Sequence, residues 1–263
     1  MSKKSIRYYG WQPDLPDHRD YSFQALIKVT KLPSKIDLRN QCPAVYNQGQ
    51  LGSCTANAVA AAFEFEQMKQ DGLKVFMPSR LFIYYNERVM EHTVKTDSGA
   101  QIRDGIKSIH QKGVCPETLV PYNISKFAQK PSAKAYQAAA KNLLMSYNRV
   151  NQNVNDMKSC LAQGYPFVFG FTVYDAFESA QVAKTGKLNM PTKNETVIGG
   201  HAVMAVGYDD ANKRFMVRNS WGADWGMQGY FTMPYDYLLN DNLSTDFWTI
   251  RLVEEKAIKK SKH

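Results

Sequence analysis

The two halves of the chain carry different hydrophobic patterns, and the change near residue 147 is the strongest constraint on the fold. Before it, the stretches 55–70, 78–91 and 101–113 have the apolar spacing of helices, and the Ala-rich stretch 131–146 is also expected to be helical. After it, short apolar runs are bounded by Gly, Asp and Asn, as strands are. This order predicts an α+β protein of two lobes. The runs that we interpret as strands are PFVFGFTV (166–173), HAVMAVGYD (201–209), RFMVRNS (214–220), YFTMP (230–234) and DFWTIRLV (246–253).

Size and charge exclude several classes of protein. The chain has 263 residues, of which 44% are hydrophobic, so it can bury a substantial core. It contains no apolar run long enough to cross a membrane as a helix. Its net charge of +9 comes partly from a basic tail at 254–263, but no basic stripe interleaved with aromatic residues accompanies that tail, so nucleic-acid binding is not expected.

Residues 1–31 form an N-terminal extension with an unusual composition. Its prolines exclude a long helix, while its aromatic residues favour docking on a folded body. We expect it to brace the β lobe or to occlude a functional cleft, and the brace is favoured. These residues contain no apolar stretch as long as that of a signal peptide, so export would require a signal removed upstream. The sequence therefore does not decide the cellular compartment. The aromatic anchors are Tyr8, Tyr9, Trp11, Tyr21 and Phe23.

The chain has four cysteines, at positions 42, 54, 115 and 160. No two cysteines have CxxC spacing and no two histidines have ligand spacing, so neither a zinc site nor another cofactor is expected. The sequence leaves undecided whether one disulfide bond forms. A reactive Cys54 would have to stay free, which leaves an odd number among Cys42, Cys115 and Cys160.

Cys54 stands where the Ala-rich helix is predicted to begin, in the stretch QGQLGSCTANA. Unpaired N–H groups at a helix N-terminus favour the thiolate, which is the nucleophilic form of cysteine. Gly49 and Gly52 allow the backbone to turn tightly and to approach a substrate. On these residues alone, a buried structural cysteine is the favoured interpretation.

His201 is the histidine best placed to act as a base. It follows two glycines and opens the predicted strand HAVMAVGYD, so the strand would fix its backbone. Further on, VRNSWGADWGMQGYF places Asn219 beside Trp221. The tryptophan ring could shield a hydrogen bond between the Asn219 amide and the His201 imidazole, and such a bond would orient the ring. A purely structural loop with two core tryptophans explains the motif equally well.

From about Leu32 to Tyr230 the chain resembles the papain-like cysteine peptidases. The resemblance rests on the segment 32–58, on the segment 97–122 that ends in Pro-Tyr, and on the His and Asn motifs quoted above. The order Gln, Cys, His, Asn is the order of that family. The resemblance implies a papain-like α+β fold, with a helical lobe, a β-barrel-like lobe and an active-site cleft between them.

The resemblance also implies the role of each site residue. Cys54 would be the nucleophile, His201 the general base and later the acid, and Asn219 the residue that orients His201. The side chain of Gln48 and the backbone N–H of Cys54 would form the oxyanion hole. The reaction would be hydrolysis of peptide bonds through an acyl-thioester, on protein or peptide substrates, by a monomer. The implied substrate-binding residues are Ser98, Gly99, Gly200, Ala202 and Trp221. Gly199, Gly200 and Ala202 would place no charge beside the pocket for the substrate residue two before the scissile bond, so an apolar or aromatic residue is expected there.

The chain departs from the family pattern at three places. Thr55 stands where the family usually has Trp, and Leu51 stands where it usually has a bridged Cys. The usual CxGG of the substrate wall is replaced by DSGA at 97–100, so the corresponding disulfide is absent. These departures concern local rigidity and the shape of the substrate subsites rather than the catalytic residues.

The predicted organisation is the extension 1–31, a peptidase domain at 32–253 and the basic tail. Within the domain, the helical lobe is expected mainly at 50–146 and the β lobe mainly at 147–253. Two other functions stay open. A transglutaminase-like acyl transferase uses a similar Cys–His pair but usually has Asp as the third member. A catalytically silent papain-like scaffold commonly lacks the Cys or the His, whereas this chain retains both.

Overall fold

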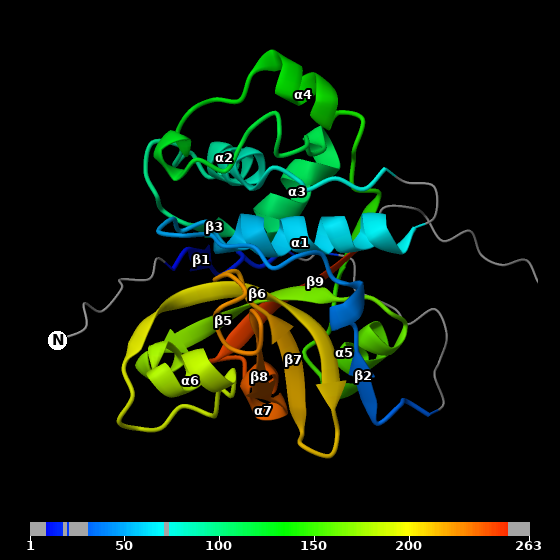
Figure 1. Cartoon of the computed structure of the whole chain (residues 1–263), viewed down its shortest axis with the longest axis vertical. Coiled ribbons are helices and arrows are strands. Elements are labelled where there is room, and N and C mark those ends of the chain that lie inside the picture. Colours follow the sequence, from blue (N-terminus) through cyan, green and yellow to red (C-terminus); the bar gives the residue numbers. More distant parts are fainter. Residues whose placement is uncertain (1–8, 18–19, 21–30, 71–73, 252–263) are drawn as a thin grey trace, which may run out of the picture.

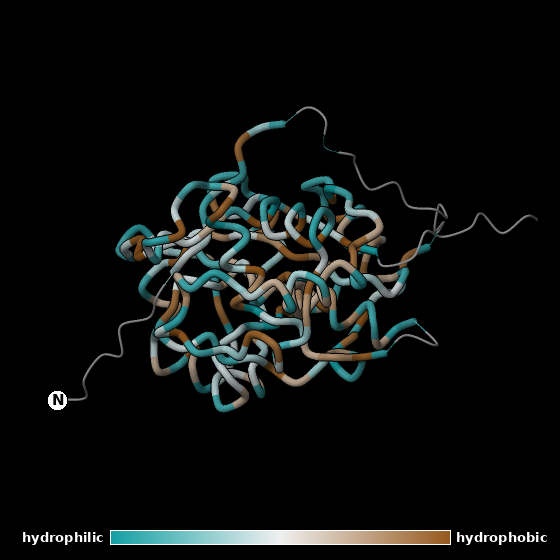
Figure 2. The backbone as a smooth tube through the Cα atoms, turned by 90° about the horizontal axis from the view of Figure 1, so that it is seen from above, coloured by the Kyte–Doolittle hydropathy of each residue, from teal (hydrophilic) through white to brown (hydrophobic). Residues whose placement is uncertain are grey.

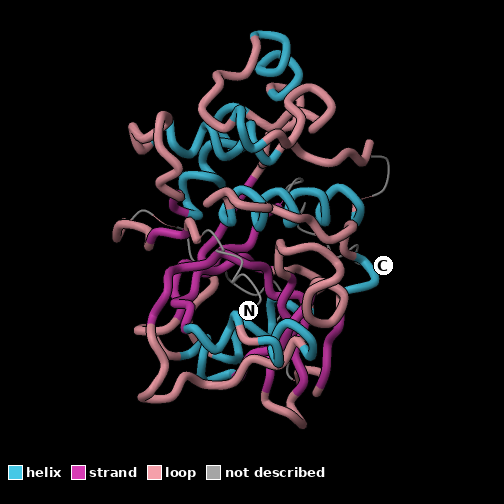
Figure 3. Tube along the Cα trace, turned by 60° about the vertical axis from the view of Figure 1, so that its left-hand side comes forward, coloured by secondary structure: helices cyan, strands magenta, loops and turns pink. Residues whose placement is uncertain are grey.

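The computed structural model describes residues 9–17, 20, 31–70 and 74–251. Helices α1 to α4 gather in one lobe, and the other lobe holds the large sheet together with the short helices α5, α6 and α7 (Figures 1 and 3). Helix α1 lies along the boundary between the two lobes (Figure 1). The helices are α1 (Cys54–Lys69), α2 (Arg80–Met90), α3 (Ile102–Lys112), α4 (Ala133–Ala139), α5 (Val154–Ala162), α6 (Ala180–Thr185) and α7 (Tyr235–Leu239).

The second lobe is built on a seven-stranded sheet with the strand order β4-β9-β5-β6-β7-β8, in which β2 also pairs with β6. Every pairing in this sheet is antiparallel. A separate two-stranded parallel ladder joins β1 to β3 between the lobes (Figure 1). The strands are β1 (Trp11–Gln12), β2 (Lys35–Asp37), β3 (Ala100–Gln101), β4 (Ser146–Arg149), β5 (Phe167–Tyr174), β6 (Val197–Asp209), β7 (Arg214–Arg218), β8 (Tyr230–Pro234) and β9 (Ser244–Arg251).

Helix α1 is buried on nearly all sides because it packs against α2 and α3 in one lobe and against β6 in the other. Its small alanines allow this close approach from both directions. The β lobe is filled by aromatic side chains of β5, among which Phe167, Phe169 and Phe171 are fully buried. Hydrophilic segments predominate at the periphery of the molecule (Figure 2).

The predicted helices at 55–70, 78–91 and 101–113 correspond to α1, α2 and α3. Local signals fix two of their ends: the Ser79 side chain accepts the Phe82 N–H at the start of α2, and Gly113 ends α3 with φ +75°. Five of the nine strands, β5 to β9, fall within or overlap the predicted runs.

The helix predicted over 131–146 is wrong over its second half. Helix α4 ends at Ala139, and the chain then turns into β4, which pairs with β9. The side chain of Asn142 donates to the carbonyl oxygens of Val114 and Ala138, so the chain leaves the helix there with its polar groups satisfied. Alanine's helix propensity is therefore overridden by tertiary pairing. The short helices α5, α6 and α7 were not predicted.

The strand that carries His201 begins earlier than predicted. Strand β6 starts at Val197, so His201 lies inside the strand, opposite Phe171 of β5, rather than at its start. Among the described residues, no helix is both long and apolar enough to traverse a bilayer.

Candidate active site

Cys54 is the first residue of α1 and is fully buried. The residue before it is held firmly, because Ser53 Oγ lies 2.6 Å from the hydroxyl of Tyr122 and accepts an N–H of Asn57 at 3.1 Å. The Tyr122 hydroxyl in turn donates to the carbonyl oxygen of Gln48 at 2.9 Å. The Pro-Tyr segment therefore connects the turn at Gln48 to the start of the helix.

The imidazole of His201 is oriented by Asn219. Nε2 of His201 lies 2.8 Å from Oδ1 of Asn219, and both side chains are buried. An amide oxygen can only accept, so Nε2 carries the proton and Nδ1 is the nitrogen able to take one up. Oδ1 of Asn219 also accepts the backbone N–H of Ser220 at 2.8 Å, which fixes the amide.

Trp221 covers the His201–Asn219 contact. Its ring stacks on the imidazole with centroids 5.2 Å apart and an interplanar angle of 29°. Phe177 and Trp225 pack on Trp221 with centroid distances of 5.0 Å and 5.2 Å. This aromatic cluster keeps water away from the hydrogen bond, which is stronger in such surroundings.

Gln48 is fully buried beside the same loop. Its amide oxygen accepts the hydroxyl of Ser220 at 2.6 Å, and its Nε2 donates to the carbonyl oxygen of Leu51 at 3.0 Å. Its backbone N–H donates to the carbonyl oxygen of Ser220 at 2.8 Å. The turn before Cys54 is thus bonded to the loop that carries Asn219.

The thiol lies next to the histidine strand. Burial raises the pKa of the Cys54 thiol to about 11, and backbone N–H groups of Ala202, Gly10 and Thr55 act in the opposite direction. The sulfur therefore lies near the backbone of Ala202, the residue that follows His201.

Part of the N-terminal extension lies in the cleft between the lobes, close to the thiol. The carbonyl oxygen of Gly10 accepts the N–H of Ala100 at 2.6 Å, and Gln12 Nε2 donates to the carbonyl oxygen of Ser98 at 2.6 Å. The approach is so close that a Cβ on Gly10 would lie 1.7 Å from the carbonyl oxygen of Gly52. A Cβ on Gly99 would lie 2.0 Å from the carbonyl oxygen of Gly10.

Two aromatic rings of the same segment cover the glycines of β6. A Cβ on Gly199 would lie 2.7 Å from Tyr9, and one on Gly200 would lie 2.7 Å from the ring of Trp11. The Tyr9 ring also meets the imidazole of His201 edge-on at 5.9 Å. The residues just before His201 therefore make room for the chain's own N-terminal segment.

The predicted site residues thus converge on one place. Cys54, His201, Asn219 and Gln48 surround the start of α1. Among the predicted substrate-binding residues, the segment 9–17 touches Ser98, Gly99 and Gly200. Ala202 is buried against the thiol, and Trp221 stacks on the histidine. Tyr8, Tyr21 and Phe23 lie outside the described residues.

Hydrogen bonds stand where the family usually has a disulfide. Both carboxylate oxygens of Asp97 accept the N–H of Gly52 at 3.0 Å, and the hydroxyl of Tyr84 donates to the same carboxylate. Asp97 occupies the cysteine position of the CxGG wall, and Gly52 follows Leu51, so the link joins the same two loops. All four cysteines are free thiols. The hydroxyl of Thr55 is also used, because it donates to the buried carboxylate of Glu87 at 3.0 Å.

Two features of the site were not predicted from the sequence. Ser220 connects Gln48 to the Asn219 loop, and Asp246 of β9 accepts the indole N–H of Trp11 at 3.1 Å. Asp246 belongs to no recognised motif, and although Ser220 lies within VRNSWGADWGMQGYF, nothing in that motif indicates its bond to Gln48. In the part of the chain that the structure describes, no three His, Cys, Asp or Glu side chains meet as a metal site would require.

A buried thiol at a helix start, beside a strand that carries an oriented histidine, is the arrangement of a cysteine hydrolase. Residues 32–241 match the sequence profile described as "Papain family cysteine protease". The chain therefore belongs to the papain family and is a cysteine protease, as the sequence motifs predicted.

Individual relatives agree with this assignment. The uncharacterized peptidase C1-like protein L477 of Acanthamoeba polyphaga mimivirus is 44% identical over 277 residues, which cover 96% of this chain and 89% of that protein. Xylellain, a cysteine protease from Xylella fastidiosa, superposes with a TM-score of 0.89 at 45% identity, covering 96% of this chain and 99% of xylellain. That likeness confirms the predicted two-lobed papain-like fold. Mouse pro-cathepsin H is 28% identical over 208 residues, covering 76% of this chain and 59% of that protein.

Proposed function

We propose that the protein hydrolyses peptide bonds with Cys54 as nucleophile and His201 as general base and acid. The observation that carries this proposal is the 2.8 Å contact between His201 Nε2 and Asn219 Oδ1, together with the position of the Cys54 thiol beside the backbone of Ala202, the residue that follows His201. With Nε2 fixed as the donor to Asn219, Nδ1 is the nitrogen that accepts the thiol proton.

The reaction then proceeds in two steps. The sulfur of Cys54 attacks the carbonyl carbon, the C–N bond breaks, and the protonated His201 gives its proton to the leaving amine. Water, deprotonated by His201, next attacks the thioester carbon and releases the acid and the thiol. The Gln48 amide and the Cys54 backbone N–H would hold the oxyanion in both steps, and each such donor is typically worth ~10²–10³ in rate.

We further propose that residues 9–17 keep the enzyme latent. Gly10 lies on the thiol, and Tyr9 and Trp11 cover the glycines beside His201. The same segment also touches both lobes, since β1 pairs with β3 while Trp11 bonds Asp246 of β9. Occlusion of the cleft and bracing of the lobes are therefore two consequences of one docked segment.

A thiol-directed epoxide inhibitor provides the test of the nucleophile. The purified full chain is incubated with the inhibitor and digested, and mass spectrometry is expected to place the adduct on Cys54. Cys42, Cys115 and Cys160 are free thiols in the same chain and serve as internal controls. An adduct on one of those three alone, or peptide turnover retained by Cys54→Ala, would contradict the mechanism.

The alternative functions have less support. An acyl transferase of the transglutaminase type usually has Asp as the third member, and the residue that contacts His201 is Asn219. A silent binding scaffold would not need the contact between Asn219 and His201. Epoxide labelling separates the scaffold from the enzyme, and product analysis with added amine acceptors separates transfer from hydrolysis.

A further inference from the structure

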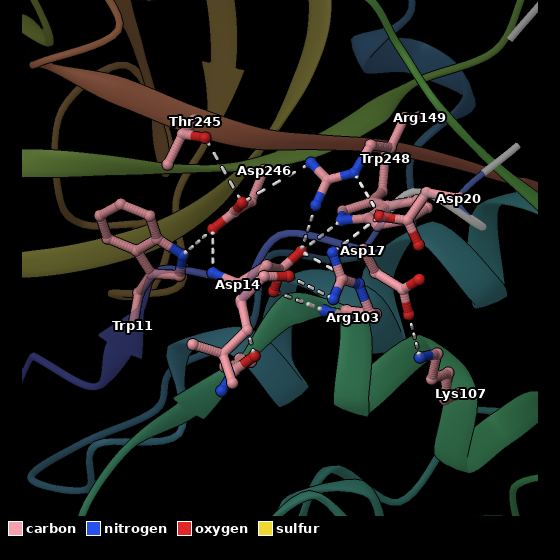
Figure 4. A network of polar contacts seen from close by, with 12 residues as sticks. Trp11, Asp14, Asp17, Asp20, Arg103, Lys107, Arg149, Thr245, Asp246 and Trp248 are labelled. Atoms are coloured by element: carbon pink, nitrogen blue, oxygen red, sulfur yellow. Dashed lines mark hydrogen bonds and ion pairs between the residues drawn. The ribbon is translucent and has the colours of Figure 1, made fainter. Parts of the chain in front are cut away.

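Trp11 of the docked segment occupies a pocket in the β lobe. Its ring lies against Gly170 of β5 and Gly200 of β6, where an added Cβ would lie 1.9 Å and 2.7 Å from it, respectively. Its indole N–H points to the carboxylate of Asp246 on β9, at 3.1 Å (Figure 4). Because Gly200 was predicted to help form the pocket for the substrate residue two before the cut, Trp11 stands where that side chain would bind.

Asp246 is aimed at this pocket by an irregularity in β9. Its φ is +59°, an uncommon value for a residue with a side chain. The pairing of β5 with β9 shifts register here, since Val168 faces Trp248 while Gly170 faces Thr245. Such bulges turn a side chain out of its regular alternation, and they are common beside active sites. The carboxylate is consequently only 2% exposed, with the pocket on one side.

The two oxygens of Asp246 face different surroundings (Figure 4). Oδ1 lies 3.4 Å from the hydroxyl of Thr245 and 3.7 Å from the guanidinium of Arg149, both of which belong to the folded body. Oδ2 accepts the indole N–H of Trp11 and, at 2.8 Å, the backbone N–H of Asp14. Within the described residues, both hydrogen-bond donors to Oδ2 belong to the segment, so its departure removes them.

Once the segment leaves, water takes the place of these donors. A substrate side chain that fills the pocket displaces that water and must itself supply a donor, because a buried carboxylate oxygen without one costs free energy. The pocket is long enough for an indole, because it holds one now. A second cation is disfavoured, since Arg149 faces the same carboxylate, and Arg103 and Arg149 both contact the segment's Asp20 at 2.7 Å. A large aromatic side chain with an N–H therefore fits better than lysine or arginine.

We propose that Asp246 is a specificity-determining residue of this protease, selecting tryptophan two residues before the scissile bond. This inference rests on the proposed function, because it assigns the side chain that the cleft accepts once the segment has left. It also revises the expectation drawn from Gly199, Gly200 and Ala202 alone, which predicted an apolar or aromatic preference without a polar determinant.

The test uses the full chain with Gly10→Val and Trp11→Ala. The valine cannot fit beside the Gly52 carbonyl, so it expels the segment, and the alanine removes the resident indole. Two peptides compete in one reaction: one carries tryptophan at the position in question, the other 3-benzothienylalanine, in which sulfur replaces the indole N–H. Their ratio of kcat/KM does not depend on the fraction of open enzyme. We expect about a tenfold preference for tryptophan, as a hydrogen bond to a charged group provides.

Three further variants in this background test whether the Asp246 carboxylate causes the preference for tryptophan. Asp246→Gly suits a positive φ and removes the carboxylate, so the preference should vanish. Asp246→Asn also tolerates this backbone and keeps one oxygen, so a reduced preference should remain. Thr245→Val alters only the contact to Oδ1 and is the matched control that should keep the full preference.

A binding measurement keeps the inference separate from the proposed function. In the same background with Cys54→Ala, calorimetry measures the affinity for the two peptides without turnover. Tighter binding of the tryptophan peptide, lost in Asp246→Gly, would support the pocket even if the catalytic mechanism failed. Equal binding of the two peptides, binding of neither, or a preference for arginine over tryptophan would overturn the assignment of Asp246.

Discussion

The carbonyl oxygen of Gly10 accepts the backbone N–H of Ala100 at 2.6 Å, which makes the N-terminal segment a parallel partner of the substrate wall. The backbone of Gly10 also lies beside the thiol of Cys54. The segment therefore occupies the cleft next to Cys54 while its own carbonyl oxygen is bonded to Ala100.

The first prediction concerns release of the segment. Gly10→Val should raise peptide hydrolysis and epoxide labelling of Cys54 by at least about tenfold, because the new side chain cannot be accommodated and each 1.4 kcal/mol of weakened docking opens the site tenfold more often. Initial rates with a fluorogenic peptide provide the measurement. Leu15→Ala is the control, since that side chain is 70% exposed in the same segment and should change neither rate. Unchanged rates in Gly10→Val would refute latency.

The catalytic residues could be proposed from the sequence because each lies in a compact local motif. Cys54 stands at the start of an Ala-rich helix, His201 lies in a strand motif, and Asn219 lies in a loop motif. Asp246 could not be found this way. Its role depends on a bulge that shifts β9 against β5, and no property of the stretch 244–251 alone specifies that register.

Secondary structure was also predicted well where its signals are local and poorly where they are not. The helices with local caps and clear periodicity were predicted to within a residue or two. The stretch 140–149 was predicted wrongly, because β4 forms by pairing with β9, which is distant in the sequence. The hydrogen bond between Ser220 and Gln48 likewise joins segments that are distant in the sequence. A serine in a sequence does not indicate which distant residue its hydroxyl group will contact.

The second prediction separates the roles of two site residues. His201→Ala should lower kcat/KM by ~10²–10⁴, the usual worth of a general acid–base group. Asn219→Ala should lower it less, because the ring would lose its orientation but keep its chemistry. Asn219→Ala should also destabilise the fold by about 1 kcal/mol through the lost hydrogen bond. Steady-state kinetics and urea unfolding of both variants decide this. Equal losses of activity, with Asn219→Ala fully stable, would contradict the assigned roles.

The third prediction concerns Asp97, which stands in the position of a family cysteine. Asp97→Ala leaves the Gly52 N–H without its acceptor and should lower the free energy of unfolding by about 1–3 kcal/mol. The loop before Cys54 should also lose protection from amide hydrogen exchange. Asp241→Ala removes an exposed carboxylate from the β lobe and serves as the control. A stability loss no larger than that of the control would show that the hydrogen bonds do not replace the missing bridge.

The last prediction concerns pH. Among the described residues, three carboxylates (Asp14, Asp20 and Asp246) meet two guanidinium groups (Arg103 and Arg149) where the segment docks, and Asp17 faces Lys107 (Figure 4). Burial, followed by repulsion from Asp246, raises the pKa of Asp14 to about 7. Burial also raises the pKa of Asp246. The cluster therefore retains a proton that its members would release when the segment is undocked or unfolded.

The sign of the effect follows from proton uptake. Between about pH 4, where a free aspartate titrates, and about pH 7, the docked state binds more protons than the undocked state, so docking weakens as pH rises through this window and is then constant. Asp14→Asn cannot titrate and should lose most of this dependence, while it keeps an oxygen to accept the Trp248 N–H. Hydrogen exchange of the Ala100 amide, which is bonded to Gly10, reports docking without using the thiol. Its protection factor should fall from pH 5 to pH 7 in the natural chain and much less in Asp14→Asn. Protection that rises with pH in the natural chain would contradict the predicted sign and would show that a retained proton does not stabilise the docked segment.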